Sequence, residues 1–198
     1  EDVRLVAKAL NAHDIPFCII NIRPGKAVSQ KDSSVDHWIT EQPKYAINLF
    51  CTTGTEQVVY ACLLGMEHYH GRYNIGLWPW ELPEWPGSCH HAYDAVDEIW
   101  GISRYTANAY RSTNKPIYPM SLPVAVDEVA DLKRKDFQLP ENTYLFVFAI
   151  DFNSTMVRKN PEAVIDAFQK AFPDKNANVG LVIKVSHSQK LNRQWKNL

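Results

Sequence analysis

The sequence predicts an α/β protein in which helices cover parallel sheets, and three features support this prediction. Short, continuous apolar runs alternate with segments of helical periodicity. The apolar runs are of the kind found in strands that are buried on both faces. The alternation stops at a charged, weakly patterned stretch, residues 125–142. We therefore expect two α/β units joined by this stretch, each with its own sheet.

The elements follow in order from these patterns. In the first unit, strands are expected at residues 17–22, 45–50, 72–78, 97–103 and 116–124. Helices are expected at residues 2–12, 55–65, 87–96 and 103–114. The polar residues 23–44 predict low order. The second unit is expected to contain strands at 144–152 and 179–186, a helix that starts at Pro161 and runs to Phe172, and a last helical fragment at 189–198.

The composition indicates neither a nucleic-acid-binding nor a membrane-spanning protein. The chain has 198 residues, 45% of them hydrophobic, and a formal net charge of −1. This balance, without a basic stripe, does not indicate a nucleic-acid-binding protein. No stretch approaches the roughly 18 apolar residues that a bilayer-spanning helix needs.

The cysteine pattern indicates the redox compartment of the protein, and the first residues were searched for a signal peptide. None of the four cysteines forms a C-x-x-C pair, and two lie in apolar runs, so we expect small buried thiols in a reducing compartment and no disulfides: Cys18, Cys51, Cys62 and Cys89. No signal-peptide pattern is present. Because Glu1 opens the chain inside an apparent helix, we expect the chain to be a fragment of a longer protein.

Two cations stand directly before the predicted helix of the second unit. Arg158 and Lys159 precede Asn160, a good N-cap residue, and Pro161, which suits the first position of a helix. Free backbone N–H groups and the helix dipole favour an anion at such a junction. Arg158 can hold a phosphate in a fork and Lys159 adds a mobile charge. The junction could therefore hold a phosphate, and two solvated surface cations beside a helix cap are the alternative interpretation. The sequence has neither a P-loop nor a dinucleotide fingerprint.

The histidines do not predict a metal site. His68 and His70 lie in a polar connection, and the adjacent His90 and His91 point to different faces of a helix. Although Cys89 precedes this second pair, we expect surface histidines and no metal.

Three segments together carry a family resemblance, in this order: "RYNIGLWPWELPEWP", "VDEIWGISRYTANAY" and "FVFAIDFNSTMVRKNPEAVIDAFQKAF". The chain resembles the group 1 glycosyltransferases (family 4, retaining) over roughly residues 45–186. The resemblance implies the GT-B fold: a Rossmann-like acceptor-side domain at 1–124, a connection at 125–142, and the incomplete start of a nucleotide-sugar-binding domain at 143–198. The family's glycine-rich turn and paired-glutamate motif are absent, so the fragment alone is not expected to be active.

The resemblance also implies roles for residues of the second unit. Lys159 matches the family's lysine that holds the donor diphosphate, which makes it a catalytic candidate as well. Arg158, Asn160 and Lys184 are further donor-binding candidates. A cation at a strand end is the alternative interpretation of Lys184.

Acceptor binding is expected at the ends of two strands in the first unit. Glu81 is the second catalytic candidate, because it could bind hydroxyl groups or orient a developing charge. Trp80, Glu81 and Ser103 are the acceptor-binding candidates, and Trp78 and Trp85 could extend an apolar platform for a sugar ring. Core packing of the tryptophans and helix capping by Ser103 are the alternatives.

The implied reaction is transfer of a sugar from a nucleotide-diphosphate sugar to a glycan or lipid-linked acceptor, with retention of configuration. The resemblance implies no cofactor and no metal. It points to a cytoplasmic protein of polysaccharide biosynthesis and leaves peripheral association with the inner face of the membrane open. A nucleotide-sugar epimerase of the same fold and a non-catalytic module that binds a nucleotide sugar or a partner are the alternatives.

Overall fold

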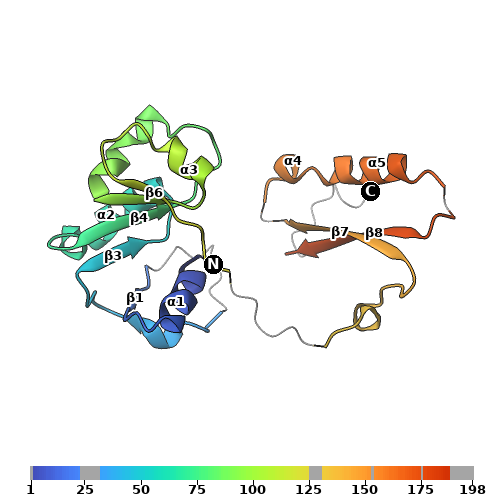
Figure 1. The fold of residues 1–198 in the computed structure, drawn as a ribbon, viewed down its shortest axis with the longest axis horizontal. Helices are drawn as coiled ribbons and strands as arrows, with labels where there is room; N and C mark the ends of the chain where they lie inside the picture. The colour runs from blue at the N-terminus through green and yellow to red at the C-terminus, as the bar shows by residue number, and fades with distance from the viewer. Residues whose placement is uncertain (1, 23–31, 125–130, 153, 175, 188–198) are drawn as a thin grey trace. The chain divides into compact units, whose positions relative to one another are not determined.

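The chain divides into two compact units, Glu1–Asp127 and Glu128–Leu198, called the N-terminal and the C-terminal unit below. A computed structural model describes residues 2–22, 32–124, 131–152, 154–174 and 176–187 (Figure 1). Each unit has a parallel sheet of its own. The predicted α/β class with parallel sheets is therefore confirmed.

The main sheet of the N-terminal unit has four parallel strands in the order β3-β4-β5-β6. They are β3 (Ile47–Phe50), β4 (Tyr73–Trp78), β5 (Glu98–Gly101) and β6 (Ile117–Pro119). A separate parallel pair contains β1 (Ile19–Ile20) and β2 (Ile39–Thr40). The order follows the sequence, so the carboxyl ends of β4 and β5 are neighbours.

Helices are present at each of the four places predicted for the N-terminal unit, although the one predicted at 103–114 ends at Ala109. The helices are α1 (Asp2–Ala12), α2 (Gly54–Leu64), α3 (Arg104–Ala109) and the 3-10 helices η1 (Asp36–Trp38), η2 (Met66–His68) and η3 (Gly87–Ala95), of which η1 and η2 were not predicted. α2 begins before Thr55, because Thr53 and Glu56 form a capping box. The low-order prediction for 23–44 is wrong for η1 and β2, which lie within this stretch, and residues 23–31 of it lie outside the described part.

Aromatic side chains form the core of this unit. Trp78 and Tyr110 are fully buried, and Trp78 stacks on Trp85 with ring centroids 5.8 Å apart. The Trp78 indole donates a hydrogen bond of 2.7 Å to Oε1 of the buried Gln57. Gly76 leaves room for this indole, since a Cβ at Gly76 would lie 2.4 Å from Trp78 Nε1. The core therefore fixes the end of β4, where the predicted acceptor residues begin.

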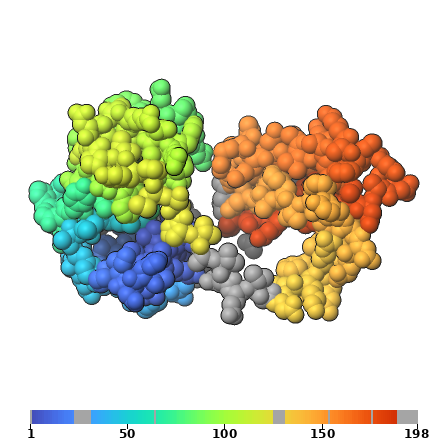
Figure 2. Space-filling model, in the orientation of Figure 1, coloured from blue at the N-terminus to red at the C-terminus, as the bar shows by residue number. Residues whose placement is uncertain are grey.

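The C-terminal unit has a parallel pair of long strands, β7 (Tyr144–Asp151) and β8 (Val179–Ser186). Two helices, α4 (Met156–Lys159) and α5 (Pro161–Ala171), lie between them in the sequence, and η4 (Arg134–Phe137) precedes β7. α5 lies on the outside of the unit (orange in Figures 1 and 2) and packs on β7 through Phe146 and Phe168, whose ring centroids are 5.8 Å apart. The predicted helix at 189–198 lies outside the described residues.

The stretch predicted as a connection is tied to the start of β7. Nη1 of Arg134 donates hydrogen bonds to the backbone oxygens of Pro140, Glu141 and Thr143, and the bond to Thr143 is 2.6 Å long. Residues 125–130 of this stretch lie outside the described residues. The domain boundaries predicted at residues 124 and 143 remain predictions.

The four cysteines are free thiols, and none is fully buried. The expectation of buried thiols is wrong for Cys62, which is exposed on α2. Burial raises the pKa of the Cys51 thiol to about 12, so this cysteine is the closest to the expected kind. None of the helices in the described part of the chain has the length and the apolar character that a bilayer crossing requires.

Candidate functional site

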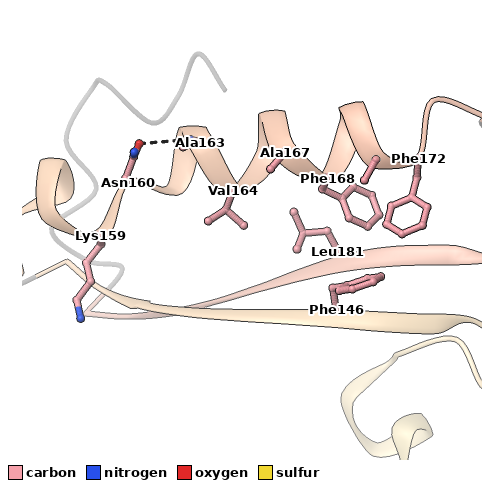
Figure 3. A pocket seen from close by; sticks show the side chains of 10 residues that line it. Phe146, Lys159, Asn160, Ala163, Val164, Ala167, Phe168, Phe172 and Leu181 are labelled. Carbon is pink, nitrogen blue, oxygen red and sulfur yellow. Dashed lines mark hydrogen bonds between the residues drawn. The ribbon is translucent and has the colours of Figure 1, made fainter.

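The predicted donor site lies where α4 ends and α5 begins. The backbone of Asn160 is left-handed, with φ 44° and ψ 56°, a conformation that asparagine tolerates better than most residues. Its side chain accepts the N–H of Ala163 at 3.3 Å, and Pro161 follows at the first helical position. The predicted N-cap and the predicted helix start are therefore confirmed (Figure 3).

The two cations occupy a different local structure from the one expected. No helix was predicted before Pro161, but Arg158 and Lys159 form the last turn of the short helix α4. The partial negative charge at a helix C-terminus favours cations, which explains their place before a second helix that would otherwise repel them. The left-handed Asn160 separates the two helices. The sequence prediction missed α4 because four residues show no helical periodicity.

The start of α5 offers fewer free donors than a helix N-terminus usually has. Pro161 has no N–H, and the N–H groups of Ala163 and Val164 bond to the side chain and the backbone oxygen of Asn160. The N–H of Glu162 remains in the first turn, but its carboxylate lies in the same turn. The predicted contribution of the helix end to anion binding is therefore reduced, and the cations dominate the electrostatics.

Lys159 is half-buried and lies at one end of a cavity of about 510 Å³ between α5 and the sheet. Figure 3 shows its side chain directed from the start of α5 toward the strands. Asn160 also lines this cavity, whereas the other lining side chains are apolar: Phe146, Ala163, Val164, Ala167, Phe168, Ala171, Phe172 and Leu181. A charged group is unfavourable among these side chains. A diphosphate would therefore bind at the Lys159 end and not inside the cavity.

Arg158 is exposed, and its Nη2 donates a hydrogen bond of 2.7 Å to the Ser154 hydroxyl. This bond holds the guanidinium over the turn between β7 and α4. Arg158 and Ser154 together provide charged and neutral donors next to Lys159. The sequence analysis did not predict a role for Ser154. Its position four residues before Arg158, in the loop that follows the strand, could have indicated one.

Lys184 does not join the other donor candidates on one face of the sheet. Leu181 of β8 pairs with Phe146 of β7, and both side chains line the cavity under α5. Side chains alternate along a strand, so Lys184, three residues after Leu181, points to the opposite face. It is exposed there. The expectation that Lys184 points to the site of Lys159 is therefore wrong, because the register places it on the other side.

The predicted acceptor residues meet at the carboxyl ends of β4 and β5. Ser103 caps α3, because its hydroxyl accepts the N–H of Thr106 at 3.1 Å. The Thr106 hydroxyl lies 3.1 Å from the Ser103 hydroxyl and donates to the backbone oxygen of Trp80 at 3.3 Å. The buried Thr106, which the sequence analysis missed, thus joins the segment of Trp80 and Glu81 to Ser103. It lies three residues after the cap, the position at which a cap binds the helix.

The tryptophans divide between core and surface. Trp78 and Trp85 are buried in the core, so their predicted use as a sugar platform is wrong. Trp80 is partly buried, packs edge-on against Trp85 with ring centroids 4.7 Å apart, and donates its indole N–H to the backbone oxygen of Glu84 at 2.9 Å. Glu81 is exposed. Of the predicted platform, Trp80 therefore remains, with the Glu81 carboxylate beside it in the sequence.

The clearest changes in pKa belong to the core of the N-terminal unit. Burial raises the pKa of Tyr110 and of Tyr93, and it raises the pKa of Tyr69 to about 12. Within the described ranges, no three His, Cys, Asp or Glu side chains come together as ligands for a metal ion.

These features define an α/β protein with Rossmann-like parallel sheets and polar side chains at the carboxyl ends of its strands. No model of a known protein family matches the chain, and no curated protein matches it either.

Proposed function

We propose that the chain is part of a glycosyltransferase that moves a sugar from a nucleotide-diphosphate sugar to a glycan or other hydroxyl acceptor with retention of configuration. The proposal rests on the sequence resemblance, with the parallel α/β architecture as support. The observation that supports it most directly is the place of Lys159 between the start of α5 and the strands. Ligands of doubly wound α/β proteins bind at this end of the strands.

In this proposal the C-terminal unit binds the donor. The bond between the sugar and the diphosphate breaks in the reaction, and negative charge builds up on the leaving group. Lys159 would stabilise this charge more in the transition state than in the ground state, and this difference accelerates the reaction. Arg158, Ser154 and the N–H of Glu162 provide further donors at the same junction.

The N-terminal unit binds the acceptor in this proposal. The Trp80 ring provides an apolar surface, and the Glu81 carboxylate accepts hydrogen bonds from sugar hydroxyls. The acceptor hydroxyl attacks the anomeric carbon on the face that the diphosphate leaves, and the leaving phosphate takes its proton. Thr106 and Ser103 have a positioning role, because they fix the backbone at Trp80.

The test is nucleotide binding by the 198-residue chain. We expect calorimetry to detect binding of at least one of UDP, GDP and ADP. Lys159→Ala should then weaken the affinity about tenfold or more, because it removes a charge-assisted contact to phosphate. Lys170→Ala is the matched control, since Lys170 is an exposed lysine in the last turn of α5, at the other end of the helix that follows Lys159.

Equal losses in the two lysine variants would contradict the donor placement, and so would unchanged affinity in Lys159→Ala. Activity of the whole protein then distinguishes the reaction types. Nucleotide release that requires an added acceptor supports sugar transfer, whereas a changed sugar configuration without acceptor supports an epimerase. Binding without any turnover supports a non-catalytic module.

A further inference from the structure

A second cavity, of about 490 Å³, lies in the N-terminal unit between the loop after β4 and the end of α3. The lining residues whose side chains carry hydrogen-bonding groups come from two segments far apart in the sequence: Glu84, Trp85, His90, Asn108, Arg111 and Ser112. The N–H of Trp85 donates to the backbone oxygen of Ala109 at 3.0 Å and joins the two segments, since both residues line the cavity. The volume lies within the range of about 300–1,000 Å³ that small-ligand sites occupy.

One wall of this cavity is fixed by hydrogen bonds. The hydroxyl of the buried Tyr93 lies 3.0 Å from the Ser112 hydroxyl, and Ser112 lies 3.1 Å from His90 Nε2. The chain of three groups begins in the aromatic core and ends at the cavity. Ser112 and His90 are therefore held in place before a ligand arrives, which lowers the entropic cost of binding.

The other walls carry polar side chains that have no partner among the described residues. Glu84, Asn108 and Arg111 are exposed, and their side chains make no hydrogen bond or ion pair with any residue that the structure describes. Glu84 and Arg111 have opposite charges and line the same cavity, yet they do not form a salt bridge. Both heads are thus available to a ligand that lies between them.

The charge balance selects the class of ligand. The carboxylate of Glu84 disfavours an anion and the guanidinium of Arg111 disfavours a cation, so the lining favours a ligand without net charge. Arg111 and Asn108 supply donors, Glu84 supplies acceptors, and Ser112 supplies both. A hydroxyl group is a donor and an acceptor at once, so several adjacent hydroxyls satisfy this set.

We propose that this cavity binds a neutral, hydroxyl-rich molecule of about the size of a monosaccharide. The inference does not rest on the proposed function, because it uses none of Lys159, Trp80, Glu81 or Ser103. It holds whether or not the C-terminal unit binds a nucleotide. Pro83 is exposed and provides an apolar part of the wall, against which the C–H face of a sugar ring can pack.

The test is an NMR titration of the full chain with methyl α-D-glucopyranoside, D-glucuronate and D-glucosamine, which are neutral, anionic and cationic. The ring signals of His90, assigned with a His90→Gln variant, report on the cavity. We expect a saturable shift with the neutral glycoside and a weaker response to both charged sugars. Asn108→Ala and Arg111→Ala should each weaken the dissociation constant about fivefold or more, because each removes a hydrogen bond to the ligand.

Asn114→Ala is the matched control for Asn108→Ala, since Asn114 is an exposed asparagine of the turn after α3 that does not line the cavity. It should leave the dissociation constant unchanged. Three outcomes would overturn the proposal: no saturable shift with any of the three sugars, tighter binding of a charged sugar than of the neutral one, or an equal loss in Asn108→Ala and Asn114→Ala. None of these outcomes depends on nucleotide binding, so they are separate from a failure at Lys159.

Discussion

The two units bury their apolar strands to different degrees. In the N-terminal unit, residues of two strands, of the 3-10 helix η3 and of the loops and helix ends beside them share one buried cluster: Trp78, Trp85, Ala92, Tyr93, Val96, Ile99 and Tyr110. In the described part of the C-terminal unit, Ile150 and Pro161 are buried, whereas Val147 of β7 is 69% exposed and Tyr144 is 67% exposed. A continuous apolar run thus predicts a strand in both units, but it predicts burial only where other elements cover it.

The difference follows from the number of layers. Phe146 of β7 packs on Phe168 and Phe172 of α5, so one face of the C-terminal sheet has a partner. The side chains of Leu145, Val147 and Val182 point to the other face, where Val147 is exposed and the other two are only partly buried. Stability in the C-terminal unit therefore depends on one helix, and in the N-terminal unit it depends on an aromatic interior.

The largest effect is expected from Trp78→Ala. The substitution removes the centre of the aromatic cluster and leaves Gln57 buried without its partner, so it should lower the free energy of unfolding of the N-terminal unit by about 4 kcal/mol. Urea denaturation followed by tryptophan fluorescence measures this loss. Hydrogen exchange at the amides of β7 and α5 should stay unchanged.

Trp100→Ala is the control for this prediction, because Trp100 lies in β5 of the same sheet but is only partly buried. It should cost clearly less than Trp78→Ala. Equal costs would show that the aromatic cluster does not dominate the stability of the N-terminal unit.

A smaller effect is expected from the helix caps, and it compares the two units directly. Thr53 caps α2 through a capping box, and Asn160 caps α5 from a left-handed backbone. Thr53→Ala should cost about 1 kcal/mol of the stability of its unit. Asn160→Ala should cost about 2 kcal/mol, because it loses the cap and also places a Cβ-bearing residue with no local hydrogen bond in the left-handed region. Chemical denaturation of each unit, followed at its own NMR signals, measures both losses.

Asn160→Gly separates the two contributions to this second loss. Glycine adopts the left-handed conformation without strain but provides no side-chain acceptor. It should therefore be milder than alanine at position 160, and a glycine variant as unstable as the alanine variant would rule out backbone strain as a cause.

Much of the fold could be predicted from local patterns. The strands β3 to β8 lie within their apolar runs, and the caps Ser103 and Asn160 follow from the preferences of their residue types. The extent of β1 could not be predicted, because it is set by pairing with β2, whose two residues lie in a polar stretch without a strand pattern. The local sequence thus predicts whether a segment forms a helix or a strand, whereas the length of a strand depends on the strand with which it pairs.

The sequence predicted only those features of the candidate site that follow from the positions of its residues along the chain. Residues at the ends of neighbouring parallel strands meet, so the proximity of Trp80 and Ser103 followed from the strand order. The face of Lys184 depends on the register of β8 and on the side that α5 covers. The link through Thr106 and the cavity at Arg111 depend on tertiary contacts between segments that carry no shared motif.

The last prediction is that alkaline pH destabilises the N-terminal unit. Its test variant has the smallest expected effect on stability at neutral pH. Burial raises the pKa of Tyr69 from 10.0 to about 12 and that of Cys51 from 9.0 to about 12. The unfolded chain loses these protons at lower pH than the folded chain, so the stabilisation is complete below pH 9 and falls as the pH rises toward 12.

Tyr69→Phe should reduce this fall between pH 10 and 12, whereas its direct cost at pH 7 is limited to the weak 3.3 Å bond from Tyr69 to the backbone oxygen of Gln57. Urea denaturation at pH 7, 9 and 11 measures the slope, and absorbance at 295 nm follows the phenolate. If Tyr69 of the folded protein ionised near pH 10, the aromatic interior would be open to water, and the contrast between the two units would not hold.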